Sequence, residues 1–310
     1  MSSPLSVPLD HEIVMHREVH FGSSFEAMIE YYEKEEEGAC PHLELKRIHE
    51  LASYEIQTHG NLAEQLLTEE EWEEVERAQE AYRHLHNLLE EQRPSNPVPQ
   101  LTAALILAEG TEQLGRAIDA LVRHKDGALT AMLELLRSEE MHNPLFPGYG
   151  LAPTRAVELL TRLGDKRAII ALFEALGSAG DFFEEEALFG AIKSIGAPAK
   201  EFLLKLAARS PIDSDSERAI AALSAFKADV EVAEVCWKLL QRPDILAHPI
   251  VADYLILACE GLTDEALRRS FVAFASDKNL SSTLQRDIAM IAKSWGDGNS
   301  SHTSSFVGGM

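Results

Sequence analysis

Histidines gather near the start of the chain, and imidazole is a common ligand for transition metals. Eight of the twelve histidines lie in the first hundred residues: His11, His16, His20, His42, His49, His59, His84 and His86. His42 and His49 are seven positions apart, so a helix would place both on about the same face. No His-Glu-x-x-His motif and no zinc-finger spacing accompanies them. The pattern allows a metal site, but histidines of an acidic surface explain it more simply.

The three cysteines offer little catalytic chemistry. Cys40 precedes Pro41 and His42, and an imidazole beside a thiol can activate it as a nucleophile, but no third partner follows. Cys236 and Cys259 occupy apolar positions of helical patterns and are expected in the core. The spacing matches no disulfide framework, which is typical of a reducing compartment. Phosphate-binding glycine motifs and the Gly-x-Ser-x-Gly motif are absent from the sequence, so we predict no catalytic residue and no cofactor.

The charge of the chain disfavours two classes of partner. The 310 residues include 28 Lys and Arg and 51 Asp and Glu, for a net charge of −23. Residues 1–100 hold 22 acidic and 7 basic side chains, net −15, and residues 101–310 hold 29 and 21, net −8. An acidic protein repels nucleic acids and anionic membranes, so neither is expected as a partner. The sequence has no secretory signal pattern and no apolar stretch long enough to span a bilayer, which predicts a cytoplasmic protein.

Three amphipathic helices are expected in the acidic first hundred residues. The first starts at the capping-box pattern Ser23-Ser24-Phe25-Glu26, and the second spans about His42–Thr58 and ends at Gly60. The third starts at another capping box, Thr68-Glu69-Glu70-Glu71, and reaches about Gln92. The acidic runs in this region are expected to form a solvated face, with a site for a basic partner as the alternative.

A proline-rich segment predicts the boundary of this region. Three prolines within Arg93-Pro-Ser-Asn-Pro-Val-Pro99 forbid a continuous helix. We therefore expect an acidic, histidine-rich helical region at 1–94, a second domain at 95–295 and a disordered Gly/Ser-rich tail at 296–310. The first region could cap the second domain or form a separate recognition module, and capping is favoured because Trp72, Tyr82 and Leu85 need burial.

The second domain carries a repeat. Helix-length apolar segments alternate with short breaks that contain Gly, Pro, Asp or Ser, and the first helices of four successive pairs end at Leu163, Ile195, Phe226 and Cys259. The steps between these ends are 32, 31 and 33 residues. A hairpin of about thirty residues cannot bury its apolar stripe alone, whereas stacked hairpins can. The repeat predicts an all-α fold that contains an α-solenoid.

The turns inside these pairs resemble those of HEAT-like repeats. The run Leu163-Gly164-Asp165-Lys166-Arg167-Ala168-Ile169-Ile170-Ala171-Leu172 is similar to the junction between the two helices of such a repeat, and Ser194-Ile195-Gly196-Ala197-Pro198-Ala199 is similar to its variant. The resemblance covers about 150–277 well and 97–140 loosely. It implies a right-handed α-solenoid of HEAT-like helical hairpins, preceded by the acidic helical region. Such solenoids include scaffolds, adaptors and a few enzymes, so the expected function is a non-enzymatic protein–protein interaction scaffold.

One enzyme family within this resemblance supplies the alternative. Deoxyhypusine hydroxylases hold a diiron centre with His-Glu pairs on their repeat helices. This chain has two such pairs, His11-Glu12 and His49-Glu50, where that family needs four, and both lie outside the repeats. HEAT-like chromophore lyases suggest a small-molecule carrier in the same way. The alternative function is therefore a metal-dependent enzyme or carrier that uses these four residues.

One basic segment stands out from the acidic background. Lys200, Lys205 and Arg209, together with Arg167 of the preceding unit, fall on the second helices of their pairs. If these helices line the concave side, the four cations form a stripe for an acidic peptide of another protein, or for the N-terminal helices of this chain. Scattered solubilising charges are the simpler alternative.

Overall fold

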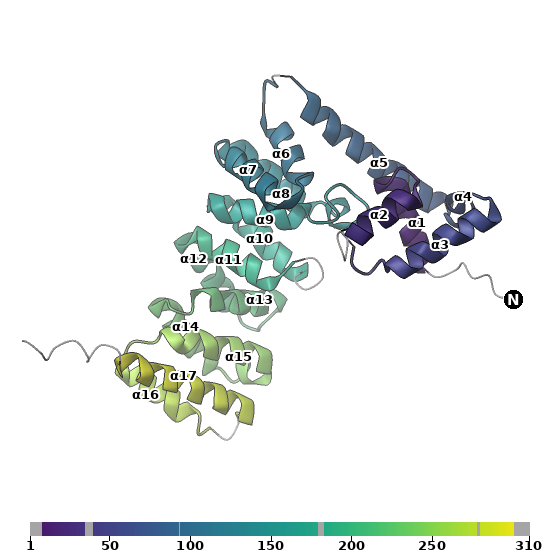
Figure 1. Cartoon of the computed structure of the whole chain (residues 1–310). Helices are drawn as coiled ribbons and strands as arrows, with labels where there is room; N and C mark the ends of the chain where they lie inside the picture. Colours follow the sequence, from purple (N-terminus) through teal and green to yellow (C-terminus); the bar gives the residue numbers. More distant parts are fainter. Residues whose placement is uncertain (1–7, 35–39, 93, 179–182, 278–279, 301–310) are drawn as a thin grey trace, which may run out of the picture. The chain divides into compact units, whose positions relative to one another are not determined.

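The protein is helical throughout the part that the structure describes. The computed structural model describes residues 8–34, 40–92, 94–178, 183–277 and 280–300. These residues form seventeen α-helices and no β-strand. Figure 1 shows the order of the helices along the chain. Six short 3-10 helices join them: Glu140–His142, Lys166–Ala168, Leu176–Ser178, Ser224–Phe226, Ile245–Ala247 and Cys259–Gly261. The all-α prediction is confirmed.

The chain divides into two compact units, at a different place from the expected boundary. The N-terminal unit comprises residues 1–163 and the C-terminal unit residues 164–310. The proline-rich segment does end a helix, because α5 stops at Glu90 and α6 starts at Val98. It does not separate two units, because α5 packs against α6 and Gln100 donates to the carbonyls of Leu89 and Glu91 at 3.0 and 3.1 Å.

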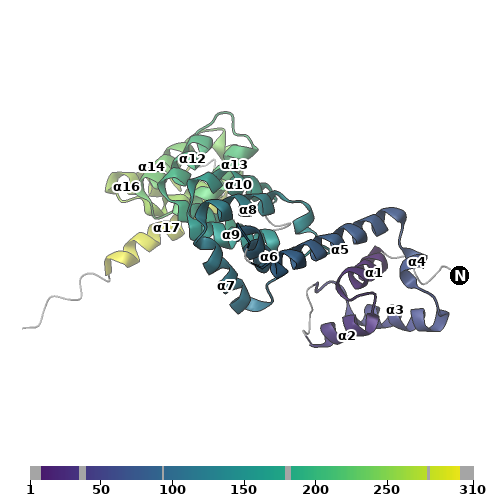
Figure 2. The same ribbon diagram turned by 90° about the horizontal axis from the view of Figure 1, so that it is seen from above.

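Nine helices make up the N-terminal unit. They are α1 (Pro8–His20), α2 (Phe25–Lys34), α3 (Leu45–Thr58), α4 (Leu62–Leu66), α5 (Glu69–Glu90), α6 (Val98–Ile106), α7 (Gly110–Val122), α8 (Lys125–Arg137) and α9 (Ala152–Leu163). The capping box at Thr68 forms as expected, with the Glu71 amide donating to the Thr68 hydroxyl and the Glu71 carboxylate accepting from the Thr68 amide. The helix that follows, α5, is the long helix seen in Figure 2.

The first five helices share one apolar core. Ile13 and Val14 of α1, Met28 of α2, Ile48 of α3 and Val75 of α5 are fully buried in it. The predicted apolar stripes therefore find their partners within the N-terminal helices themselves. Trp72 lies partly buried at the edge of this core, and Leu85 is buried further along α5.

The sequence pattern did not predict helices α1 and α4. In α1, four of the buried residues are polar or charged (Asp10, His16, Arg17 and Glu18), which interrupts the apolar periodicity. Asp10 is fully buried because both of its carboxylate oxygens accept from the Arg47 guanidinium, at 2.7 and 2.8 Å. Ion pairing therefore adds to the apolar contacts of Ile13 and Val14, and joins α1 to α3.

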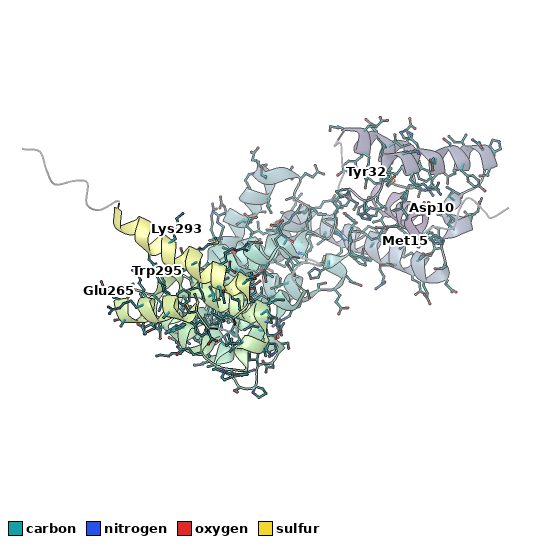
Figure 3. The ribbon with its side chains drawn as sticks, turned by 90° about the horizontal axis from the view of Figure 1, so that it is seen from below. Asp10, Met15, Tyr32, Glu265, Lys293 and Trp295 are labelled. Atoms are coloured by element: carbon teal, nitrogen blue, oxygen red, sulfur yellow. The ribbon has the colours of Figure 1, made fainter. Side chains whose placement is uncertain are left out.

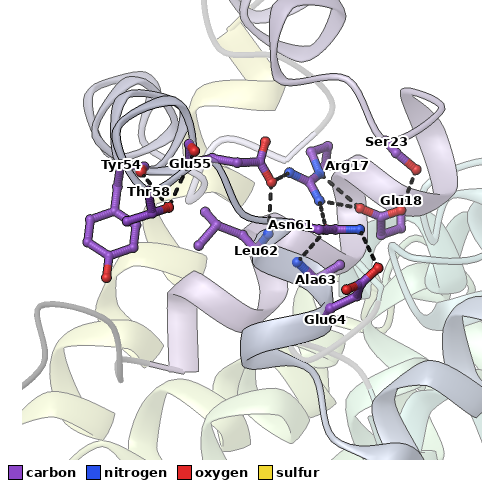
Figure 4. A network of polar contacts seen from close by, with 10 residues as sticks. All are labelled: Arg17, Glu18, Ser23, Tyr54, Glu55, Thr58, Asn61, Leu62, Ala63 and Glu64. Atoms are coloured by element: carbon purple, nitrogen blue, oxygen red, sulfur yellow. Dashed lines mark hydrogen bonds and ion pairs between the residues drawn. The ribbon is translucent and has the colours of Figure 1, made fainter.

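Arg17 is the largest of the fully buried side chains and ties α1 to the turn between α3 and α4 (Figure 4). Its guanidinium donates to Glu18, to Glu55 at 2.7 Å and to Asn61 at 3.4 Å, and it lies 4.4 Å from the centre of the Phe25 ring. Arg17 is 1% exposed and Glu18 is 5% exposed. A buried charge is stable only when it is paired, so this network depends on all of its members.

Eight helices make up the C-terminal unit. They are α10 (Ile169–Ala175), α11 (Glu185–Ile195), α12 (Ala197–Ala207), α13 (Ser214–Leu223), α14 (Val230–Leu240), α15 (Pro249–Ala258), α16 (Glu265–Phe274) and α17 (Ser282–Ser300). They follow one another in sequence order (Figure 1). Helices α11, α13, α15 and α17 form one row, in which α13 contacts α15, α15 contacts α17, and α11 contacts the 3-10 turn after α13. Each of α10, α12, α14 and α16 packs on a member of this row.

Two glycines make the tight turns that the repeat predicted. Gly164 has φ +57°, and a Cβ there would lie 3.2 Å from the Ser194 carbonyl oxygen. Gly196 has φ 76° and ψ −135°, and it both ends α11 and starts α12. Residues other than glycine rarely adopt these positive φ values.

Replacing Gly196 by alanine tests the importance of this turn. We expect G196A to lower the free energy of unfolding by about 1–3 kcal/mol, because alanine is strained at this φ and ψ. G190A is the matched control, since Gly190 lies within α11 with open space around its missing Cβ. It should raise stability by about 0.5–1 kcal/mol through helix propensity. Urea unfolding followed by circular dichroism measures both, and equal effects of the two variants would refute the prediction.

The last helices close around an aromatic cluster. Figure 3 shows Trp295 on α17, near α16, which begins at Glu265. The Trp295 indole donates to the Glu260 carbonyl at 2.8 Å, and its ring centre lies 5.6 Å from that of Phe271, which also contacts Trp237 at 5.6 Å. Helix α17 continues beyond Gly296, where the tail was expected to begin, and residues 301–310 of that tail lie outside the described residues. No helix of the described part has the length and apolar character needed to cross a membrane.

Candidate interaction surface

The four residues of the alternative metal site have separate partners. His11 pairs with Glu71 at 2.9 Å, Glu12 with His42, His49 with Glu33 at 3.6 Å, and Glu50 with Arg47 at 2.6 Å. Among the described residues, no group of three or more His, Cys, Asp or Glu side chains is placed to hold a metal ion. The two His-Glu pairs therefore do not form a common ligand set.

Two other histidines form a buried aromatic cluster with tyrosines. His16 stacks on His20 with ring centres 4.7 Å apart, and His20 stacks on Tyr149 at 4.3 Å. The His20 ring also lies 3.0 Å from the Tyr82 hydroxyl and 3.2 Å from the Pro144 carbonyl oxygen. Burial lowers the pKa of His16 to about 3 and that of His20 to about 4, so both rings are neutral near pH 7.

Cys40 lies beside this cluster but is poorly suited to nucleophilic chemistry. Its sulfur is 3.4 Å from Nε2 of His16, and an imidazole this close to a thiol can act as its general base. Burial raises the pKa of the Cys40 thiol to about 12, and only 2% of the residue is exposed. A protonated, covered thiol is neither nucleophilic nor accessible, and Cys236 and Cys259 are buried as well.

The four cations of the predicted stripe differ in their pairing. Lys200 donates to Asp229 at 2.9 Å and to Glu231 at 2.8 Å, and Arg167 pairs with Asp165 at 2.7 Å. Arg209 lies within 4 Å of Asp213 and Asp215. Lys205 is exposed, and no ion pair is recorded for it in the described part of the chain. These carboxylates compete with an acidic peptide for the same cations.

A pocket of ≈350 Å³ opens along the row that contains α11, α13 and α15. It is formed by the N-terminal parts of α11 and α15 and by the middle of α13, and we call it the α11–α13–α15 pocket. Its lining includes Glu185, Glu217, Arg218, Ala221, Ile250 and Tyr254. The volume falls within the range of about 300–1,000 Å³ that is usual for ligand sites.

The local sequence explains why this pocket is open. Pro249 starts α15, and Ile250 follows in the first turn, where a side chain has few helical neighbours. Ile250 is 72% exposed, although the next two residues of the helix, Val251 and Ala252, are buried. Ala221 on the facing helix α13 is too small to cover it. Apolar side chains around a concave pocket, with a few polar groups among them, are typical of ligand-binding sites.

Charged groups surround the apolar floor of the pocket. Glu217 lies 3.2 Å from the His248 ring, and Glu185 approaches the Tyr254 hydroxyl, which together with burial raises the pKa of that hydroxyl. The Arg218 guanidinium bonds to Asp215 and lies 5.1 Å from the centre of the Phe173 ring. Glu185 and its neighbour Glu186 form no ion pair with the described residues. The pocket has no signal in the sequence, because its residues come from three separate helices.

Comparison with known proteins gives no relative for this chain: no protein-family model, no curated protein and no solved structure matches it.

Proposed function

We propose that the protein is a non-enzymatic interaction protein. In this proposal, residues 95–295 include a right-handed solenoid of HEAT-like hairpins, and its surface holds a segment of another protein. The α11–α13–α15 pocket is the contact site, and the observation that carries the proposal is the exposed Ile250 side chain at its rim.

Three features support this function over an enzymatic one. The order of helices in the C-terminal unit, with one row contacted by the other, is the packing expected of stacked hairpins. The pocket joins three elements that are successive in that row, as a surface for an extended peptide requires. The His and Glu residues of the enzyme alternative have separate partners and do not converge on one point.

The stripe of Arg167, Lys200, Lys205 and Arg209 remains a second place for a partner, and an acidic peptide is its expected ligand. The stripe is a weaker candidate for the contact site than the pocket, because Lys200 is bound by two carboxylates and is only 15% exposed. Lys205 is exposed and forms no ion pair with the described residues, so a peptide would meet it without competition from a neighbouring carboxylate.

Selection from a phage-displayed library of random peptides tests the proposal on the full chain. Peptides enriched on the wild-type protein should bind I250S at least about tenfold more weakly, because a small polar side chain replaces the apolar contact without changing the charge of the pocket. Ser is well tolerated near a helix N-terminus, so I250S should fold normally. M290S is the matched control, since Met290 is 64% exposed on α17 and does not line the pocket. Peptides that bind I250S and the wild type equally would refute the proposed site.

A further inference from the structure

We infer that the α11–α13–α15 pocket receives a cationic, arginine-bearing peptide segment whose apolar part covers Ile250. This inference rests on the proposed function and names the class of partner. It differs from the acidic peptide expected at the basic stripe, because the pocket lies on the row of α11, α13 and α15, and its lining holds two carboxylates and one cation that is already paired.

The carboxylates at the mouth of the pocket favour a cationic ligand. Glu185 and Glu217 both line it, and Glu217 is 46% exposed. Glu217 forms an ion pair with His248, and Glu185 accepts a hydrogen bond from the Tyr254 hydroxyl. Glu186, the next residue of α11, is exposed and adds a third negative charge. A guanidinium group can bind such carboxylates with two parallel hydrogen bonds.

Arg218, the cation of the lining, does not reverse this preference. One of its terminal nitrogens bonds to Asp215, and its guanidinium lies 5.1 Å from the centre of the Phe173 ring. Its Nε is buried and has no hydrogen-bond partner among the described residues, so it is not accessible to a ligand from solvent. Asp215 therefore offsets its charge within the protein. An anionic ligand approaching Arg218 would also meet Asp215 and Glu217, which repel it.

The floor of the pocket favours a ligand with an apolar part next to its charge. Ala221, Val251 and the exposed Ile250 provide an apolar surface next to the carboxylates. The side chain of arginine has an apolar stem below a charged head, so it can cover such a surface while its head reaches the rim. The tyrosine ring of Tyr254 gives the guanidinium a flat group on which to stack.

Three small probes of the same shape test this inference. Benzamidine carries a cation on a flat apolar ring, benzamide is neutral, and benzoate is an anion. Each is titrated into the full chain labelled at the isoleucine methyl groups, with the Ile250 signal assigned from I250V. We expect benzamidine to shift the Ile250 signal and to bind about tenfold more tightly than benzamide. Benzoate should bind more weakly than benzamide.

Charge variants locate the selectivity. E185Q/E217Q should reduce the preference for benzamidine over benzamide to within about twofold. E201Q/E265Q removes two negative charges from exposed positions of α12 and α16, and it should keep the full preference. Equal binding of benzamidine and benzamide to the wild type, tighter binding of benzoate, or the same loss in both variants would overturn the inference.

The two proposals fail differently. Selected peptides that depend on Ile250 but carry no basic residue would overturn the cationic partner and leave the interaction site intact. If no peptide depends on Ile250, the proposed site itself falls, whatever the small probes do.

Discussion

Replacing Arg17 by methionine is expected to lower the unfolding free energy of the N-terminal unit by about 3–5 kcal/mol. The guanidinium is 1% exposed and bonds to Glu18 and Glu55, so its removal leaves the Glu18 carboxylate buried without its cation. Methionine replaces most of the apolar stem, and the loss therefore reports the charge network more than the packing. Urea unfolding of the full chain, followed by circular dichroism, measures the change.

A second substitution separates the charge from the packing. In R17M/E18Q the unpaired carboxylate becomes a neutral amide, so part of the lost stability should return. R83M is the surface control, because Arg83 is 68% exposed and pairs only with Glu80 one turn away. Such a pair contributes about 0.5 kcal/mol or less. A loss below about 1 kcal/mol for R17M would show that the buried network does not hold α1 in place.

Acidification is expected to destabilise the N-terminal unit through His16 and His20. Both pKa values are lowered in the folded protein, mainly by burial, to about 3 and about 4 from an ordinary value of 6.5. Because the unfolded chain binds protons more readily, these two groups stabilise the fold fully above pH 6.5. Their contribution is lost as the pH falls toward the folded values.

The expected slope is about 1.4 kcal/mol per pH unit for each histidine, or about 4 kcal/mol for both at pH 5. H16F keeps a ring that can stack on His20 but cannot bind a proton, so the slope between pH 6.5 and 5 should halve. H59Q is the control, since His59 is exposed and lies outside the cluster. Unfolding free energies measured across this pH range would refute the mechanism if wild type and H16F had the same slope.

Local patterns in the sequence predicted most of the helices. The capping box at Thr68 places the start of α5 correctly, and the turns at Gly164 and Gly196 separate the helices of their pairs as expected. These features depend on neighbours within a few residues, so a single sequence contains the information. The all-α class follows from them.

Features that depend on distant residues could not be predicted in this way. Helix α1 is held by Arg47 and Glu55, which lie more than thirty positions away, and its buried charges conceal its periodicity. The prediction of the basic stripe did not include Asp229 and Glu231. Their carboxylates, at the start of α14, bind Lys200 of α12.

The candidate site was missed for the same reason. Ile250 belongs to an apolar run, and an apolar run in a helix is normally read as core. Ile250 is uncovered because the residue that faces it on α13, Ala221, is small. Glu185 and Glu217 lie on different helices, and the fold brings them to the same rim. A sequence contains no local signal for such an assembly, although an isoleucine directly after a helix-starting proline marks a position with few neighbours.

The placement of Phe271 between Trp237 and Trp295 gives the two units distinct optical signals. The remaining tryptophan of the chain, Trp72, lies at the edge of the core of the first five helices. In a W72F background, the emission arises solely from the two indoles around Phe271, so it reports opening of the last hairpins. In W237F/W295F the emission arises solely from Trp72. The unfolding of each unit can then be followed in the full chain by the wavelength and intensity of tryptophan fluorescence.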